Sequence, residues 1–267
     1  MSGKFIKIKI LCGLFKLFKI NPMVFAYNKT GILNWQNQKL SGEKYFLEKE
    51  LLKNLGKDRD CVFFDVGANV GNYSENLLCT FKNATVHAFE PLPLCVQKLK
   101  TIQSNFKDRL IVNNLCMSDE IGNITINTYD DDPESEHASI YQDVLTVIHK
   151  SKNACGIPVI ATTLDSYCEE HKIDRIHFIK IDTEGHEYKV LLGAKRMLQE
   201  NRISYLQFEF NEMNVISRTF FKDFYDLLSE NYSLYRLNTY NLIPINSYDS
   251  LLEVFKFQNF IAVNKAQ

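Results

Sequence analysis

The segment 64–74, with the sequence FDVGANVGNYS, holds residues whose types and spacing suit the binding of a cofactor that carries a ribose. It follows the apolar run 61–64, and together they predict a buried strand, a glycine turn and the first turn of a helix. A second apolar run, 84–89, ends at Glu90. A carboxylate at the end of this second strand can accept hydrogen bonds from both ribose hydroxyls. The pattern therefore indicates a cofactor site at the carboxyl ends of two strands.

The spacing of the glycines favours one class of cofactor over another. The loop reads Asp65-x-Gly67-x-x-x-Gly71, whereas a pyrophosphate-binding turn has the pattern Gly-x-Gly-x-x-Gly. The carboxylate of Asp65 suits a cationic group, such as the amino group of S-adenosyl-L-methionine. We therefore expect S-adenosyl-L-methionine as the cofactor. An NAD-dependent Rossmann oxidoreductase is the alternative, and it would need the other glycine spacing.

The densest group of ionisable residues follows the apolar segment 176–181 and comprises Asp182, Glu184, His186 and Glu187. In a doubly wound sheet, ligands bind outside the carboxyl ends of the strands, so these side chains are candidates for the reaction centre. A histidine with carboxylates could hold a divalent cation. Their spacing matches no zinc motif, however, and we assign no metal site. The alternative is that the acids only stabilise the N-terminus of a helix through its dipole.

The alternation of apolar and amphipathic segments predicts an α/β fold with a doubly wound, seven-stranded sheet of the class I (Rossmann-like) methyltransferase type. A β-hairpin-like excursion is expected between 115 and 129, with Gly122 and Asn123 near its turn. A loop is expected between the last two strands. The seven strands expected in this sheet are 61–66, 84–90, 110–114, 176–181, 203–210, 232–237 and 257–263, and a further short strand is expected at 158–161.

Two regions lie outside this alternation. Residues 1–56 are expected to form an N-terminal helical extension of a domain that covers 57–267. Within the extension, segment 4–20 is a basic amphipathic helix that could pack on the domain or lie on an anionic membrane surface. Segment 130–157 is acidic and rich in turn residues at its start, which suits either a mobile lid over the site or a surface insertion without a role.

The composition limits the classes of molecule that we expect the protein to bind. The chain has 267 residues, of which 45% are hydrophobic and 24% charged, and its net charge is −1. This charge provides no general attraction for nucleic acid, which we do not expect as a partner. The seven cysteines contain no C-x-x-C pair and indicate reduced thiols. We expect a cytoplasmic protein, at the inner face of the membrane if segment 4–20 contacts lipid.

Five blocks of the sequence, in this order, resemble the motifs of the FkbM-type methyltransferases. The resemblance extends from about residue 61 to 212. It departs from the family at Cys116, where an alanine is usual, and it does not include the first 50 residues or the segment 130–157. The blocks are FDVGANVGNYS at 64–74, HAFEPLP at 87–93, NLCMSD at 114–119, TLD at 163–165 and KIDTEGHE at 180–187.

The resemblance implies transfer of a methyl group from S-adenosyl-L-methionine to a hydroxyl, often of a sugar or a polyketide. It implies that Glu90 meets the ribose and that Ser118 and Asp119 meet the adenine, although these two could also form only a turn. The expected cofactor-binding residues are Asp65, Gly67, Asn69, Gly71, Tyr73, Glu90, Pro91, Ser118 and Asp119.

The expected catalytic residues are Asp182, Glu184 and His186, which would face the acceptor. Methyl transfer to an alcohol is an in-line displacement that depends on alignment and on a base for the hydroxyl proton. His186 and Asp182 are both candidates for that base. The expected function is O-methylation of a small-molecule or glycan acceptor. The remaining alternative is a non-catalytic cofactor-binding partner in a glycan or envelope pathway.

Overall fold

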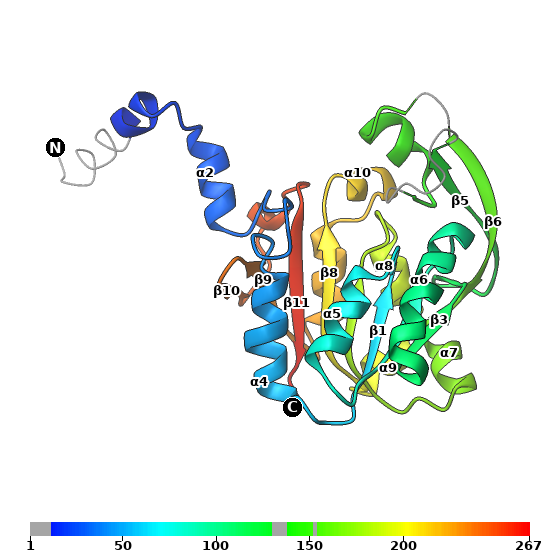
Figure 1. The fold of residues 1–267 in the computed structure, drawn as a ribbon. Helices are drawn as coiled ribbons and strands as arrows, with labels where there is room; N and C mark the ends of the chain where they lie inside the picture. Colours follow the sequence, from blue (N-terminus) through cyan, green and yellow to red (C-terminus); the bar gives the residue numbers. More distant parts are fainter. Residues whose placement is uncertain (1–11, 130–137, 152–153) are drawn as a thin grey trace.

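The computed structural model describes residues 12–129, 138–151 and 154–267. Its centre is an eight-stranded sheet with the order β10-β9-β11-β8-β7-β1-β2-β3, and a three-stranded sheet with the order β4-β6-β5 lies beside it (Figure 1). The strands of the large sheet are β1 (Val62–Val66), β2 (Thr85–Phe89), β3 (Leu110–Asn113), β7 (Ile176–Ile181), β8 (Ile203–Phe210), β9 (Tyr232–Asn238), β10 (Asn241–Ile245) and β11 (Gln258–Asn264). The strands of the small sheet are β4 (Cys116–Met117), β5 (Gly122–Tyr129) and β6 (Ala154–Thr162).

The strand directions confirm the predicted fold class. Strands β3, β2, β1, β7 and β8 run parallel to one another, while β11 lies antiparallel between β8 and β9. The carboxyl ends of the parallel strands therefore meet at one edge, as a doubly wound sheet requires.

Two details of the sheets differ from the expectation. The segment expected as a loop before the last strand contains β10, which pairs antiparallel with β9 and gives the sheet an eighth strand. Segment 158–161 belongs to the longer strand β6, which pairs with β5 and not with the large sheet. Gly122 begins β5 and lies opposite Ala161, so β5 pairs across the 130–153 segment and makes no local hairpin. Sequence periodicity identifies strands but does not choose between partners that lie far apart along the chain.

Helices cover both faces of the large sheet. One face carries α5 (Asn72–Thr80), α6 (Pro93–Phe106) and the stretch formed by α3 (Glu43–Tyr45), a π-helical segment (Phe46–Leu51) and α4 (Leu52–Leu55). The other face carries α7 (Leu164–Glu170), α8 (Glu187–Leu192), α9 (Lys195–Gln199) and α11 (Phe221–Leu228). Neighbouring residues of a buried strand pack on opposite faces of the sheet. Phe63 packs with the first set of helices and Phe64 with the second.

The TLD block at 163–165 holds two helices in place. Thr163 caps α7, because its Oγ1 accepts a hydrogen bond from the Ser166 N–H at 3.1 Å. Asp165 accepts hydrogen bonds from the N–H groups of Arg196 and Met197 at the start of α9. These side chains satisfy amide groups that a helix N-terminus leaves without intrahelical partners.

The N-terminal region consists of two parts with different packing. The stretch 43–55 belongs to the core of the α/β domain, and the ring of Phe46 lies 5.7 Å from that of Phe178 on β7. The predicted boundary after residue 56 is therefore not a boundary in packing. In contrast, α2 (Pro22–Lys29) has no buried residue and extends away from the domain (Figure 1).

Residues 12–20 also lie on the surface. Apart from the partly buried Phe15, each of them is exposed, and the side chains of Leu17 and Phe18 are 73% and 65% exposed. This described part of the predicted amphipathic helix does not pack its apolar residues on the domain, while residues 4–11 lie outside the described residues. In the parts of the chain that the structure describes, no helix has the length and apolar character needed to cross a membrane.

Replacing Phe46 with alanine should lower the free energy of unfolding by about 3–5 kcal/mol, because a fully buried ring leaves a cavity in the shared core. Phe18→Ala is the matched control and should change it by less than about 0.5 kcal/mol, because its ring is exposed. Urea unfolding followed by circular dichroism measures both. Equal small effects would show that stretch 43–55 is not part of the cooperative core.

Candidate functional site

The loops after β1 and β7 come into direct contact at the carboxyl edge of the sheet. Gly67 has a φ of 79°, and a Cβ at this position would lie 1.8 Å from the Asp182 carbonyl oxygen. The Asp182 N–H donates to the Val66 carbonyl oxygen at 2.9 Å. Only glycine fits this contact, both for its backbone conformation and for its size. The glycine loop and the acidic loop are therefore held together.

Two adjoining cavities open at this edge. The larger has a volume of about 510 Å³ and is lined by the loop after β1, by the ends of β7 and β8, and by residues of the 35–43 segment. The smaller is lined by the ends of β1 and β2, by residues 115–117 and by Ala138 and Ile140. Four of the predicted site residues line both cavities, namely Gly67, Asn69, Asp182 and Glu184.

Glu90 lies at the end of β2 and lines the smaller cavity. Its Oε2 accepts a hydrogen bond from the Asn69 N–H at 2.8 Å, and its Oε1 accepts one from the Leu92 N–H at 2.9 Å. Burial raises the pKa of the carboxyl to about 7, although the two backbone hydrogen bonds act in the opposite direction. Pro91 follows it along the wall of the same cavity. The carboxylate is thus fixed in position with lone pairs available to a ligand.

Asp65 is buried at the end of β1 and lines the larger cavity. Its Oδ2 accepts a hydrogen bond from the Ser74 hydroxyl at 2.7 Å. Its Oδ1 accepts none from the part of the chain that the structure describes. Burial raises the pKa of this carboxyl. A cationic ligand group beside Oδ1 would stabilise the ionised form, so the site fits the amino group of the expected cofactor.

Gly71 and Tyr73 have structural contacts within the protein, and their expected contact with the cofactor stays a prediction. Gly71 begins α5 with a φ of 91°, and a Cβ there would lie 2.7 Å from the side chain of Leu99 on α6. It lines neither cavity and permits close packing of two helices. Tyr73 lines the larger cavity and donates a hydrogen bond to Gln207 at 3.1 Å.

Ser118 and Asp119 belong to a polar network with His186. The Ser118 hydroxyl lies 3.0 Å from His186 Nε2 and donates to Asp119 at 3.1 Å. The Asp119 carboxylate also pairs with the ammonium of Lys189 at 2.7 Å. Burial lowers the pKa of His186 to about 4, so its imidazole is neutral at physiological pH. His186 lines the smaller cavity and not the larger one, where the acceptor would need a base.

Glu187 shapes the acidic loop from within α8. Its Oε1 accepts hydrogen bonds from the N–H groups of Thr183 and Gly185 at 2.8 and 3.2 Å, and from the Thr183 hydroxyl. The described residues after the 130–137 segment also hold this loop, because the Ser139 hydroxyl donates to the Glu184 carbonyl oxygen at 2.8 Å. The role of the insertion as a lid stays a prediction.

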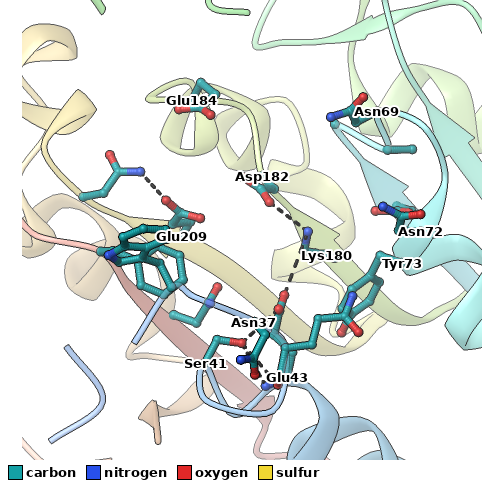
Figure 2. Close-up of a pocket in the computed structure, with 18 of the residues that line it drawn as sticks. Asn37, Ser41, Glu43, Asn69, Asn72, Tyr73, Lys180, Asp182, Glu184 and Glu209 are labelled. Carbon is teal, nitrogen blue, oxygen red and sulfur yellow. Dashed lines mark hydrogen bonds and ion pairs between the residues drawn. The ribbon is translucent and has the colours of Figure 1, made fainter. Parts of the chain in front are cut away.

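A buried ion-pair group forms one wall of the larger cavity (Figure 2). The ammonium of Lys180 lies 2.8 Å from an Asp182 carboxylate oxygen and 4.0 Å from Glu43. Burial alone would lower the pKa of Lys180, but the carboxylates of Asp182, Glu43 and Asp65 outweigh it and raise the pKa. The sequence signal for Lys180 was its charge inside an otherwise apolar strand. Glu43 gave no signal, because it comes from a segment far from the motifs.

Glu209, at the end of β8, is a further site residue that the motifs did not select. It lines the larger cavity and accepts a hydrogen bond from the Asn211 amide. Burial and the negative charges of Asp182 and Glu184 raise the pKa of its carboxyl well above the usual range. Within the described ranges, no three His, Cys, Asp or Glu side chains are grouped so that they could hold a metal ion.

Comparison with known proteins agrees with this geometry. Residues 65–236 match the family described as the Methyltransferase FkbM domain. The chain belongs to this family. Its cofactor is therefore S-adenosyl-L-methionine, as the sequence predicted.

Two curated relatives are similar in sequence. Hexuronic acid methyltransferase AglP of Haloferax volcanii is 26% identical over 165 residues, and the match covers 62% of this chain and 62% of that protein. The 2-O-methyltransferase NoeI of Sinorhizobium fredii is 25% identical over 164 residues, which cover 58% of this chain and 65% of NoeI. The match thus spans less than two thirds of the length of either relative.

Solved structures with a similar arrangement include an O-methyltransferase from Bacillus cereus in complex with SAH, with 15% identity and a TM-score of 0.45 over 84% of this chain and 80% of that one. Another is precorrin-6y C5,15-methyltransferase from Geobacter metallireducens, with 9% identity and a TM-score of 0.42 over 80% of this chain and 86% of that one.

Binding of S-adenosylhomocysteine should weaken as the pH falls below 7. Because the pKa of Glu90 is about 7 in the free protein, its carboxyl is ionised above this pH and protonated below it. Ribose hydroxyls donate most strongly to the ionised form, so affinity should fall by up to about tenfold per pH unit. Titration calorimetry across this range measures the slope. Glu90→Gln should bind weakly at every pH, and an unchanged slope in this variant would assign the effect to another group.

Proposed function

We propose that this protein is an S-adenosyl-L-methionine-dependent O-methyltransferase that acts on a hydroxyl of a sugar, a glycan or a related natural product. The observation that carries the proposal is the position of Asp182, which lines both the cavity that contains Glu90 and the larger cavity beside it. A donor held on one side and an acceptor held on the other would meet at this carboxylate. The name of one sequence relative, a hexuronic acid methyltransferase, supports a sugar as the acceptor, and the name of the other, a 2-O-methyltransferase, supports transfer to an oxygen.

Some residues of the site would bind the cofactor and others would act on the acceptor. Glu90 would hold the ribose of the cofactor, and Asp65 and the backbone at Gly67 would hold its methionine end. Ser118 and Asp119 would support the adenine end through the network that contains His186. The bound cofactor supplies a methyl group on a positively charged sulfur, which an alcohol can attack.

Asp182 is the proposed base in this arrangement. An acceptor hydroxyl in the larger cavity would donate its proton to the Asp182 carboxylate while its oxygen approaches the methyl group. Lys180 holds the Asp182 carboxylate, and the Val66 carbonyl holds the Asp182 backbone N–H. The base therefore needs little reorganisation during the reaction. His186, the other candidate base, lines only the cavity that contains Glu90. Its role would be to position Ser118.

Asp182→Asn should lower kcat by roughly 10²–10⁴-fold, because the amide cannot accept the hydroxyl proton. The affinity for S-adenosylhomocysteine should change little. His186→Asn should show the opposite pattern, with weaker binding of this ligand and a smaller loss of kcat. Transfer of a labelled methyl group from the donor to a library of methyl glycosides measures turnover, and calorimetry measures binding.

Glu230→Gln is the control for changing a carboxyl to an amide, and it should keep the turnover because Glu230 is exposed and lines neither cavity. A large loss of kcat in His186→Asn with normal turnover in Asp182→Asn would make the histidine the base. Donor binding by the wild type without transfer to any acceptor would instead favour a non-catalytic partner in a glycan or envelope pathway.

We further propose that the N-terminal segment contacts an anionic membrane surface, which would favour a lipid-linked glycan and a place at the inner face of the membrane. Exposed apolar side chains and lysines alternate along its described part. The apolar residues are Leu14, Leu17, Phe18, Ile20, Met23, Val24 and Phe25, and the lysines are Lys16, Lys19 and Lys29. Apolar burial together with attraction to anionic lipids is the mode of a surface-bound amphipathic helix.

Leu17→Asp and Phe18→Asp should each weaken binding to vesicles that contain anionic lipid by at least about tenfold, since each removes a side chain that lipid would bury. Leu251→Asp is the matched control, because Leu251 is 82% exposed and lies outside the segment. Sedimentation with vesicles of anionic and of neutral composition measures the bound fraction. The same bound fraction for all variants would refute membrane contact through this segment.

A further inference from the structure

The larger cavity has a strong excess of negative side chains. Among the described residues that line it, Lys180 is the only lysine or arginine. The acidic residues that line it are Glu43, Asp65, Asp182, Glu184, Glu209 and Glu212. Asp65 would pair with the amino group of the cofactor, and the raised pKa of Glu209 favours its neutral form. The field that a charged acceptor meets would therefore be set by the other four carboxyls and Lys180.

The positive charge of Lys180 is already used inside the protein. Its ammonium pairs with Asp182 and Glu43, and only 12% of its side chain is exposed. A carboxylate on the acceptor would have to displace one of these partners. On the rim, Lys256 lies 3.6 Å from Glu212 and is likewise paired. Among the described residues that line the cavity, the single ammonium, that of Lys180, is therefore paired with carboxylates and is not free to receive an anionic substrate.

The wall opposite the acidic loop has the groups that a sugar needs. It is formed by the 35–43 segment, with the 64% exposed side chain of Trp35 and the polar side chains of Asn37, Gln38 and Ser41. An indole ring offers a flat apolar face for the C–H face of a pyranose, and amide and hydroxyl groups can bond its hydroxyls.

This wall is held firmly in the fold. Asn37 Oδ1 accepts hydrogen bonds from the N–H groups of Lys39 and Leu40, which closes a turn. The Asn76 amide on α5 donates to Gln38 at 2.9 Å. Ser41 donates to Glu43, which in turn accepts from the Gln207 amide at 3.0 Å. The segment is therefore positioned before an acceptor arrives, which limits the entropy cost of binding.

We propose that this cavity selects a sugar ring without a carboxylate, stacked on Trp35, and that an amino group on the sugar strengthens binding while a carboxylate weakens it. The inference rests on the proposed function, since it concerns the acceptor of that reaction. Bringing a sugar carboxylate among these acids leaves it without a counter-charge, which is a penalty that neutral sugars avoid. The acceptor would then differ in charge from the hexuronic acid named for the relative from Haloferax volcanii.

Trp35 provides a direct readout, because it is the only tryptophan in the chain. The full-length protein, saturated with S-adenosylhomocysteine, is titrated with matched methyl glycosides of the gluco and galacto series. Each series contains a neutral sugar, a 2-amino sugar and a uronic acid. We expect tryptophan fluorescence to change with the neutral and amino sugars, and the uronic acids to bind at least about tenfold more weakly, a difference of about 1.4 kcal/mol.

Three variants test whether this order of affinities arises in the cavity. Glu212→Gln should bring uronic acid and neutral sugar closer in affinity by roughly two- to fivefold, as expected for removal of a partly exposed charge. Glu230→Gln, at an exposed position that does not line the cavity, should leave the order unchanged. Trp35→Phe should abolish the fluorescence signal, while calorimetry should still detect the neutral sugar.

The outcomes separate this inference from the proposed function. Uronic acids that bind as tightly as neutral sugars would overturn the charge argument, and a panel that leaves Trp35 fluorescence unchanged would overturn the sugar subsite. If labelled methyl groups reach a hydroxyl that is not on a sugar, O-methyl transfer stands and this inference fails. If sugars bind in the expected order but receive no methyl group, the selectivity stands and the proposed reaction fails.

Discussion

The site depends on the contact between the backbone at Gly67 and the carbonyl of Asp182. There is no room for a side chain at this point, and the positive φ of Gly67 suits only glycine. Because β1 and β7 are neighbours in the sheet, their loops leave the carboxyl edge side by side, and the Val66 carbonyl fixes the register between them. The contact places the loop for the cofactor against the loop that carries the proposed base, and both cavities open beside it.

Buried charge gives this edge its chemical character. Lys180 brings an ammonium into the sheet and holds Asp182 and Glu43 around it. Elsewhere the burial of carboxyls is not balanced by a cation, and the pKa values of Glu90, Glu187 and Glu209 are raised as a result. An interior with several raised carboxyl pKa values is typical of a functional site, since packing alone would favour apolar residues.

The N-terminal region takes part in both the core and the larger cavity, although its composition indicates neither role. The stretch 43–55 completes the core on one face of the sheet, and the 35–43 segment before it forms a wall of the larger cavity. The exposed part from residue 12 to α2 is separate from both, and its apolar side chains remain available for a surface outside the protein. One continuous extension therefore packs, lines a cavity and projects outward.

The sequence by itself determined the class of fold, the cofactor and the strand ends that carry Asp65, Glu90 and Asp182. These rest on local signals, namely apolar periodicity and glycine spacing, which are readable in a single strand–turn–helix unit. Only the tertiary structure decided that His186 lines the smaller cavity, that Gly71 permits the close packing of α5 and α6, and that β6 pairs with β5. It also brought Glu43 and Trp35 to the larger cavity. These outcomes depend on packing between segments far apart in the chain, and a local pattern does not encode which distant surface a side chain will meet.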